Sequence, residues 1–350
     1  MSNLTRILSS ALLIIMILVT AGWISFQNAL EKSVINSETV IVEIPKGMAF
    51  NEIVNLLRSH NTQIDPIWFK VIAYWYRLAD KIQAGEYELK PGSTSLEVLR
   101  QFVDGRVKQY SLTFPEGWRF NDMLQLLANA ANLRHILNCP NDLNNHLRIL
   151  QVEKTHPEGW FFPDTYSFTK NTSDVTLLRR AHQKMLAVLE AEWQAKQQDL
   201  PLENSYQALI LASIIEKETA LVNERADIAG VFIRRLQKGM PLQTDPTVIY
   251  GMGDTYQGDI RTKDLKTPTL YNTYLISGLP PTPIAMPGRE AIHAALHPSP
   301  GDSLYFVAKG DGSHVFSSTL AQHNKAVKEY LRRQENKHQD SKLTSVINDD

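Results

Sequence analysis

The chain has 350 residues, of which 43% are apolar and 21% charged, and this length is more than one ordinary hydrophobic core organises. Its 36 Lys and Arg residues against 37 Asp and Glu residues exclude the basic excess that is typical of nucleic-acid-binding proteins. The single cysteine, Cys139, excludes an intrachain disulfide and any metal site with several thiolate ligands. We therefore expect two or three domains and no nucleic-acid partner.

The N-terminal part of the chain predicts a membrane-spanning helix over residues 7–27. No charged residue occurs from Ile7 to Leu30, and about 20 apolar residues span a hydrocarbon core of roughly 30 Å. A cleaved signal peptide is the alternative, because Val19 and Ala21 could form a small-residue cleavage site. The length of the apolar run favours an uncleaved anchor.

The charges around this segment indicate its orientation. Arg6 and the terminal amine precede it, whereas Glu31 and Lys32 cancel each other after it. We expect a short cytoplasmic end over residues 1–6, a linker over 28–38 and the bulk of the chain outside the cytoplasm.

A repeated pattern follows the linker. "IPKGMAFNEIVNLL" (Ile44–Leu57) matches "FPEGWRFNDMLQLL" (Phe114–Leu127) at an offset of 70, and "LKPGSTSLEVLRQF" (Leu89–Phe102) is a weaker third copy. Each copy follows an alternating, strand-like run and enters an amphipathic helix through a Pro-x-Gly turn. We expect equivalent packing of Phe50 and Phe120, both buried beside the preceding strand, although such turns are also common without shared ancestry.

From about Glu153 onwards the pattern changes to helices followed by a loop-rich part. Helices are predicted over Ser173–Gln198, with Ser173 or Asp174 as the N-cap, over Ser205–Val222, and over Asp227–Gly239. Strand-like pieces are expected in "LQTDPTVIYGMG", "TPTLYNTYLISGLPPTPIAMPG" and "GDSLYFVAKGDGSHVFSS", and a disordered tail over residues 336–350. The sequence therefore predicts an α+β fold for the chain.

The segment "LILASIIEKETALV" (Leu209–Val222) holds the candidate catalytic residue. At about 100° per residue, Glu218 shares a helical stripe with Leu211, Ile214 and Ile215, whereas Glu216 lies about 160° further round. Burial beside aliphatic side chains disfavours a carboxylate, so we expect Glu218 to have the raised pKa that a general acid needs. A solvated charge cluster at the end of a helix would give the same spacing.

The other constellations in the sequence are weaker. His293 and His297 have the i, i+4 spacing of two zinc ligands, but Ala294 stands where a metalloprotease has Glu and no third ligand is evident. We therefore expect no metal site. Asp245, Tyr271, Asn272 and Tyr274 suit a sugar-binding groove, although turn chemistry explains Asp245 and Pro246 equally well.

Long motifs identify a resemblance to a known family. "LASIIEKETA", "LQTDPTVIYG", "YNTYLISGLPPTPIAMPG" and "LYFVAKGDGSHVFSSTLAQHN" together resemble the endolytic murein transglycosylase family, and the similarity covers essentially the whole chain. The resemblance implies an inner-membrane protein with its catalytic domain in the periplasm. It implies a transmembrane helix, a LysM-like domain over 39–108, a second strand–helix unit with a connector over 109–152, and a mixed α+β catalytic domain over 153–335.

The resemblance also implies an activity. Family members cleave peptidoglycan glycan strands internally, between N-acetylmuramic acid and N-acetylglucosamine, and leave 1,6-anhydro-muramyl ends. They are lyases that need neither a metal nor an organic cofactor. The implied partners are glycan strands, the inner membrane and cell-wall synthases, and the implied role is to terminate nascent strands.

The family motif assigns catalysis to the second glutamate of Glu-Lys-Glu, which is Glu218 here. The resemblance gathers Gln243, Asp245, Tyr271 and Asn272 around it as substrate-binding residues, and Glu216 is expected to support the site as a binding or structural residue. Two alternatives remain open. A hydrolytic muramidase would need a second carboxylate, and a non-catalytic peptidoglycan-binding scaffold would need none.

Overall fold

The fold was determined as a computed structural model that describes residues 3–137, 143–150 and 156–347. The connector predicted over 109–152 and the tail predicted over 336–350 therefore lie partly outside the described residues, as does Cys139. The chain divides into two compact units. Unit 1 comprises Met1–Ser111 and Ser167–Asn171, and unit 2 comprises Leu112–Tyr166 and Thr172–Asp350.

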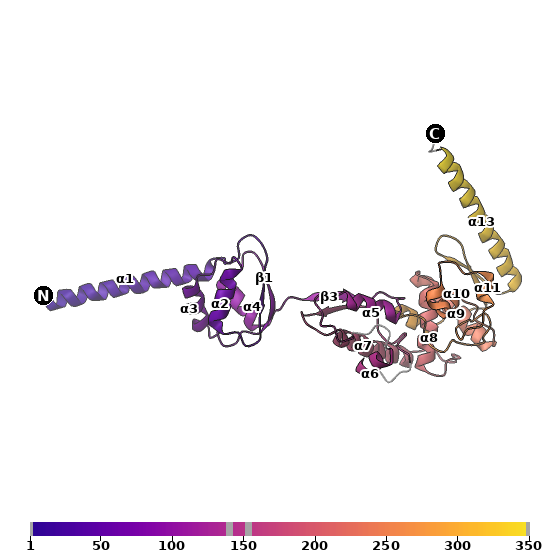
Figure 1. Ribbon diagram of the computed structural model, residues 1–350, viewed down its shortest axis with the longest axis horizontal. Helices are drawn as coiled ribbons and strands as arrows, with labels where there is room; N and C mark the ends of the chain where they lie inside the picture. Colours follow the sequence, from indigo (N-terminus) through magenta and orange to yellow (C-terminus); the bar gives the residue numbers. More distant parts are fainter. Residues whose placement is uncertain (1–2, 138–142, 151–155, 348–350) are drawn as a thin grey trace. The chain divides into compact units, whose positions relative to one another are not determined.

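Unit 1 is built from a long helix and a small α+β core. The helix α1 (Asn3–Glu31) contains the segment Arg6–Glu31, which is long and apolar enough to cross a membrane. The remaining elements, coloured indigo to violet in Figure 1, are β1 (Val40–Ile44), α2 (Phe50–Ser59), α3 (Pro66–Trp75), β2 (Gly85–Leu89) and α4 (Ser95–Val103). β1 and β2 pair antiparallel, with Val42 opposite Tyr87. The mixed α+β expectation is met here.

The helix α1 is joined to the core of unit 1 through its last turns. Phe26 is buried, Ala29 and Leu30 pack against the same core, and α1 contacts α3 and α4. Earlier in the helix the side chains from Ile7 to Ile24 are exposed. The C-terminal end of α1 is therefore part of a folded unit, and its N-terminal part stands free.

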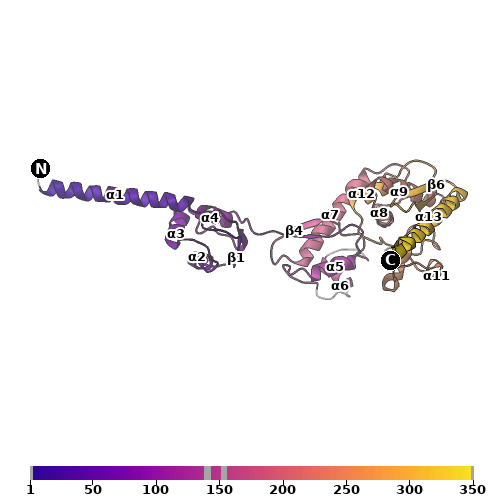
Figure 2. The same ribbon diagram turned by 90° about the horizontal axis from the view of Figure 1, so that it is seen from above.

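Unit 2 carries most of the helices (Figures 1 and 2). Its elements are β3 (Tyr110–Thr113), which begins in unit 1, α5 (Phe120–Ala128), α6 (Leu143–Leu150), β4 (Thr165–Phe168), α7 (Asp174–Gln194), α8 (Ser205–Glu218), α9 (Val222–Gln237), α10 (Asp245–Met252), the short 3₁₀ turn η1 (Gly253–Thr255), α11 (Thr262–Leu265), α12 (Arg289–Leu296), β5 (Tyr305–Ala308), β6 (His314–Ser317) and α13 (Leu320–Ile347).

Packing in unit 2 centres on α8. The helix α12 packs against α7, α8 and α9, and α8 also contacts α10. The α8 residues from Ala208 to Ile215 are all buried, so this helix is surrounded by other elements. β5 and β6 form an antiparallel hairpin, with Phe306 opposite Phe316. The side chain at the end of α8 is therefore held by a rigid core.

The structure confirms several predicted elements and corrects others. The strand-like run expected before the third repeat is β2, and Ser173 caps α7 by accepting a hydrogen bond from Thr176 N (3.1 Å). The strand-like pieces expected in "GDSLYFVAKGDGSHVFSS" are β5 and β6, which pair as a hairpin. The predicted strand in "LQTDPTVIYGMG" is wrong, because α10 begins at Asp245. Pro246 stands in its first turn, where proline lacks only an amide that a helix does not use.

Two further segments differ from the sequence-based expectation. The segment from Thr267 to Gly288 contains no strand; it is a series of turns, whose short Pro- and Gly-rich pieces do not pair. The helix α13 continues to Ile347, through most of the predicted tail, and its Lys, Glu, Gln and Arg residues all favour helix.

The three repeated segments adopt the same local structure. Gly47, Gly92 and Gly117 all have positive φ angles, 85°, 87° and 74°. In each case an acidic residue at the third helical position accepts a hydrogen bond from the N-cap amide: Ala49 N to Glu52 (3.0 Å), Thr94 N to Glu97 (2.8 Å) and Arg119 N to Asp122 (2.9 Å).

The two phenylalanines of the repeat occupy equivalent positions but differ in burial. Each is the first residue of its helix, and each stacks on another phenylalanine, Phe50 on Phe69 and Phe120 on Phe161. Phe120 is buried, as expected, whereas Phe50 is only half-buried. The local strand–turn–helix prediction holds, and the expected full burial of Phe50 does not.

A buried carboxyl group joins α5 to α10 within unit 2. Glu158 is 4% exposed; its Oε1 accepts a hydrogen bond from Phe120 N (2.8 Å) and its Oε2 accepts one from the Tyr250 hydroxyl (3.0 Å). Burial raises the pKa of Glu158 to about 7, against the opposing effect of these two hydrogen bonds. Below about pH 7 the protonated form of Glu158 therefore predominates in the folded protein.

Glu158→Gln is expected to change how stability depends on pH. Because the folded-state pKa of Glu158 lies above its unfolded value of 4.5, its stabilising contribution is complete below pH 4.5 and is lost as pH rises through 7. The wild type should lose roughly 3 kcal/mol relative to the variant over this window. Denaturation of both full-length proteins between pH 4.5 and 8 measures the difference, and parallel pH profiles would contradict the assignment.

Candidate active site

Glu218 is the last residue of α8. The helix is capped at its start by the Asn204 side chain, which accepts a hydrogen bond from Gln207 N (3.1 Å), and Thr219 leaves it in an extended conformation. Leu211, Ile214 and Ile215, the aliphatic stripe that the sequence assigned to Glu218, are all fully buried. Glu218 therefore continues a fully buried aliphatic stripe and stands where the helix ends.

The surroundings of Glu218 favour its neutral form. Its side chain is half-buried, accepts a hydrogen bond from the Thr244 hydroxyl, and lies at the C-terminal, negative end of a helix dipole. Burial raises the pKa of Glu218 to about 7; the Thr244 hydrogen bond opposes this rise, and the negative charge of Asp245 adds to it. Near neutral pH this carboxyl group can both give and accept a proton.

Glu218 borders a cavity of about 540 Å³. The cavity lies between the end of α8, the loop that precedes α10, the β5–β6 hairpin and the first turns of α13. Its lining mixes aromatic rings with amide, hydroxyl and charged groups: Glu218, Arg235, Leu242, Gln243, Thr244, Asp245, Tyr274, Tyr305, Phe306, Val307, Ala308, His314, Leu320, His323, Asn324 and Val327. This combination suits a sugar, whose hydroxyl groups and apolar ring faces need both kinds of contact.

Two of the predicted binding residues lie in this cavity with Glu218. Gln243 and Asp245 both line it, and the Tyr274 hydroxyl donates a hydrogen bond to Asp245 Oδ1 (2.7 Å). Burial, followed by the effect of Asp245, raises the pKa of Tyr274, so this hydroxyl stays protonated and acts as a donor. The structure therefore gathers Gln243, Asp245 and Tyr274 around the Glu218 carboxyl.

Tyr271 and Asn272 lie elsewhere in unit 2. Asn272 is fully buried, and its side-chain amide donates to the carbonyls of Leu265 (3.0 Å) and Thr267 (2.8 Å). The Tyr271 hydroxyl is 2.8 Å from the Thr282 hydroxyl, and the ring packs edge-on against Tyr250. The expectation that their side chains border the cavity of Glu218 is not met, because both are engaged in holding loops together.

Glu216 is also outside this cavity. Its Oε1 accepts a hydrogen bond from Arg225 Nη2 (2.9 Å), its Oε2 accepts one from Gly288 N (2.9 Å), and the side chains of Glu216 and Arg225 are only 5% and 6% exposed. Burial raises the pKa of Glu216, while Gly288 and Arg225 oppose the rise. Since Gly288 is the N-cap of α12, Glu216 links the end of α8 to α9 and to the start of α12.

The loop that carries Thr244 and Asp245 is held by a dense set of hydrogen bonds. Arg235 on α9 donates to the carbonyls of Pro241 (3.1 Å) and Leu242 (2.9 Å) and to the Gln243 side chain (3.2 Å). Thr273 accepts from Gln243 N (3.0 Å) and from Thr244 N (3.1 Å). This network fixes the hydroxyl that contacts Glu218.

Gln243 adopts a strained backbone conformation within this loop. Its φ angle is +53°, a region that a non-glycine residue enters at a cost of about 1–3 kcal/mol. The contacts from Arg235 and Thr273 hold it there and leave it at the edge of the cavity. Strain of this kind concentrates at functional sites, which supports Gln243 as a site residue.

Sequence reasoning missed several residues of the cavity. Tyr305, His314, His323 and Asn324 line it, although they follow Glu218 in the chain by about a hundred residues. His323 stacks on Tyr305 (5.2 Å), and its Nδ1 is buried without a hydrogen-bond partner among the described residues. No spacing pattern pairs these residues with α8; only the motif "LYFVAKGDGSHVFSSTLAQHN", which contains all four, drew attention to them.

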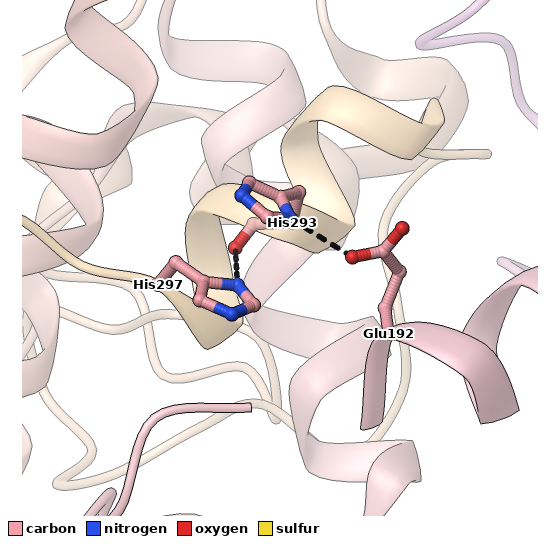
Figure 3. Close-up of side chains that lie close together, drawn as sticks. All are labelled: Glu192, His293 and His297. Atoms are coloured by element: carbon pink, nitrogen blue, oxygen red, sulfur yellow. Dashed lines mark hydrogen bonds and ion pairs between the residues drawn. The ribbon is translucent and has the colours of Figure 1, made fainter. Parts of the chain in front are cut away.

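One group of side chains has the composition of a metal site. The sequence offered His293 and His297 without a third ligand, and the structure brings Glu192 of α7 to them, so that potential ligand atoms of all three lie within 4.8 Å of one another. Figure 3 shows Glu192 pointing toward His293, with His297 at the end of the same helix.

Hydrogen bonds within the protein already occupy these groups. Glu192 accepts from Arg289 Nη1 (2.7 Å) and faces His293 Nδ1 (2.9 Å), and both ring nitrogens of His297 face backbone carbonyls, those of His293 (3.1 Å) and Ala195 (2.8 Å). Although burial alone would raise it, the pKa of Glu192 is held below its usual value by His293 and Arg289. The cluster is therefore a hydrogen-bonded contact that joins α7 to α12.

Glu216→Gln is expected to lower stability more than Glu116→Gln. Both carboxylates approach Arg225, Glu216 at 2.9 Å and Glu116 at 3.6 Å, but the Glu116 side chain is 47% exposed and its ion pair is weak. Removing the buried partner leaves the charge of Arg225 with only the exposed Glu116 beside it, which costs about 3 kcal/mol. Thermal melts of the two variants measure this difference, and equal melting temperatures would show that Glu216 does not anchor α8.

Known proteins resemble this chain over most of its length. The YceG-like family matches residues 42–329. A protein named endolytic murein transglycosylase from Bacillus subtilis (strain 168) is 29% identical over 312 residues, which cover 84% of this chain and 85% of the relative. A protein with the same name from Streptococcus pneumoniae serotype 2 is 26% identical over 364 residues, which cover 94% of this chain and 66% of the relative.

A solved structure also matches. The 2.6 Å crystal structure of a yceG-like protein from Listeria monocytogenes superposes with a TM-score of 0.51 and 29% sequence identity, and covers 83% of this chain and 99% of the crystallised one. The family match includes β1 from Val42 onwards, β2, α8 with Glu218, the Thr244 loop and the β5–β6 hairpin. The chain belongs to the YceG-like family, the family of the endolytic murein transglycosylases.

Proposed function

We propose that this protein is a lytic transglycosylase that cleaves the β-1,4 bond between N-acetylmuramic acid and N-acetylglucosamine within peptidoglycan strands. The observation that carries the proposal is the Glu218 carboxyl: it borders a polar and aromatic cavity, and its pKa is raised to about 7. The names of the relatives from Bacillus and Streptococcus give the same substrate class.

One carboxyl group with this pKa suffices for the reaction. Protonated Glu218 donates its proton to the glycosidic oxygen, and the bond from that oxygen to C1 of the muramic acid breaks. The C6 hydroxyl of the same sugar then bonds to C1 and returns its proton to the Glu218 carboxylate. The product is a 1,6-anhydro ring, no water is consumed, and neither a metal nor an organic cofactor takes part.

The neighbours of Glu218 divide into those that reach the substrate and those that hold the site. Gln243, Asp245 and Tyr274 line the cavity and are proposed to bind sugar hydroxyl groups. Thr244 contacts Glu218 directly and orients its carboxyl group. Glu216 and Asn272 are proposed to act as structural residues, because their polar side-chain atoms bond within the protein.

A hydrolytic muramidase is the second candidate, and Asp245 is the observation in its favour. Hydrolysis of a glycoside uses two carboxyl groups, and among the described residues Asp245 is the other carboxyl that lines this cavity. Its hydrogen bond from Tyr274 supports instead a role in binding. Mass spectrometry of digested peptidoglycan separates the two: anhydro ends support transglycosylation, and reducing ends support hydrolysis. If no product is released, the result supports a non-catalytic peptidoglycan-binding scaffold.

We further propose that α1 anchors the protein in the inner membrane, with units 1 and 2 in the periplasm. A signal peptidase would have to cut near Val19 and Ala21, in the middle of a helix that continues unbroken into the core of unit 1 through Phe26. The two strands of unit 1 with α2 and α4 are proposed to form a LysM-like glycan-binding module. An anchored enzyme of this kind would end nascent strands beside the synthases that make them.

Glu218→Gln is expected to reduce anhydro-muropeptide release by about 10²–10⁴-fold or more, because general acid catalysis is worth that much and the same group serves both proton transfers. Folding should be kept, since the amide is nearly isosteric and removes a carboxyl that burial keeps close to neutral. Product release and thermal melting are measured together, with Glu216→Gln as the matched control, for which the larger effect should be on the melt. Near-normal release by folded Glu218→Gln would disprove the assignment.

The pH dependence gives an independent test of Glu218 as the acid. Activity should fall about tenfold per pH unit above pH 7, where Glu218 loses its proton. Because the negative charge of Asp245 helps to raise the pKa of Glu218, Asp245→Asn should move this falling limb to lower pH, whatever it does to the maximal rate. The pH profile of kcat/KM for both proteins measures the shift, and an unmoved limb would contradict it.

A further inference from the structure

The helix α3 exposes an apolar stripe. Ile67, Val71, Tyr74 and Trp75 are 71%, 38%, 64% and 65% exposed, and their i, i+4, i+7, i+8 spacing puts them on one face of the helix. None of the four is charged. The opposite face, with Phe69, Ile72 and Ala73, is fully buried in the core of unit 1.

A surface helix of a water-soluble unit usually has a polar outer face opposite its buried one. α3 has two apolar faces instead, and one of them remains exposed in the described structure. Its residues include a tyrosine and a tryptophan, which are enriched where proteins meet the headgroup region of a membrane. The stripe is therefore suited to an apolar surface that also accommodates the Tyr74 hydroxyl and the Trp75 indole N–H.

The position of α3 along α1 identifies that neighbour. Phe26 of α1 is 5.7 Å from the Trp75 ring and 6.1 Å from the Trp68 ring, and it also contacts Trp23 (5.9 Å). The 20 residues from Ile7 to Phe26 extend about 30 Å as a helix, which is the thickness of a hydrocarbon core. When α1 spans a bilayer, Phe26 lies at its boundary, and α3 lies at the same depth.

We propose that the stripe formed by Ile67, Val71, Tyr74 and Trp75 inserts into the interfacial layer of the bilayer that holds α1. This inference rests on the membrane anchorage proposed above and goes beyond it, because a spanning helix whose last turns pack into unit 1 holds this unit near the bilayer but does not by itself bring α3 into contact with lipid. With Phe26 buried in the core and α3 in the headgroup region, unit 1 has two points of attachment.

Two attachments fix the orientation of unit 1 on the membrane. α3 packs beside α1, whereas β1 lies on the side of unit 1 away from the free end of α1 (Figures 1 and 2). The strands β1 and β2 and the turns that follow them are then directed away from the lipid. In this orientation the face of unit 1 that carries β1 and β2 stays accessible to other molecules.

The test uses the full-length protein in vesicles of phosphatidylethanolamine and phosphatidylglycerol. In a Cys139→Ser background, single cysteines are introduced at Tyr74 on the stripe, at Leu13 in the span and at Ile41 on β1, which is 45% exposed and serves as the matched control. Each is labelled with a polarity-sensitive fluorophore. Quenching is measured with lipids that carry a nitroxide near the headgroup, for Tyr74→Cys and Ile41→Cys, and with lipids that carry it within the acyl chain, for Leu13→Cys. Val71→Cys replaces Tyr74→Cys if the latter does not fold.

The expected result is a blue-shifted emission and strong lipid quenching at Tyr74→Cys and none at Ile41→Cys. Quenching at Leu13→Cys alone, with Tyr74→Cys as water-exposed as Ile41→Cys, would overturn the inference and keep the anchor. No quenching at Leu13→Cys would disprove the anchor itself, and the inference with it.

Discussion

The buried carboxylate of Glu216 is the interaction on which the site depends. It binds the guanidinium of Arg225 on α9 and the amide of Gly288, the N-cap of α12, at once, so three helices meet at the last turn of α8. A helix end normally frays, because its final carbonyls lack partners. Here the Glu216 side chain, on the other side of the helix from Glu218, holds that end in place. Glu218 can therefore be positioned without making these packing contacts itself.

Glu216 and Glu218 belong to one motif, but their different neighbours give them different roles. Both are removed from water, which raises the pKa of each. Glu216 receives a cation and a backbone amide, which offset the cost of its charge. Glu218 receives one hydroxyl group from Thr244 and the repulsion of Asp245, so its proton is retained to about pH 7. A structural anchor and a proton donor therefore stand two residues apart.

Helix geometry predicted the local part of this site, the family resemblance supplied Gln243 and Asp245, and the other long-range contacts had no signal in the sequence. The stripe of Leu211, Ile214 and Ile215 indicated the burial of Glu218, because a helix relates these positions by simple geometry. Asn272 has the composition of a sugar ligand, yet its amide binds three backbone carbonyls, those of Asp264, Leu265 and Thr267, and no pattern in the sequence shows where a chain turns back on itself. Similarly, Glu192 meets His293 from another helix, and this long-range approach has no signature in spacing.

The repeated strand–turn–helix segments show that one local structure can serve different ends. All three use a glycine with positive φ and an acid that binds the N-cap amide. Around Gly47 no described residue lies close enough to contact an added side chain, so that turn faces open space. The turn at Gly117 instead donates its amide to Met286 (2.8 Å), and its carbonyl accepts a hydrogen bond from Lys217 (3.2 Å), between Glu216 and Glu218. The turn at Gly47 in unit 1 is thus exposed, whereas the turn at Gly117 in unit 2 supports the candidate active site. The local structure is the same, and the tertiary contacts of each turn make the difference.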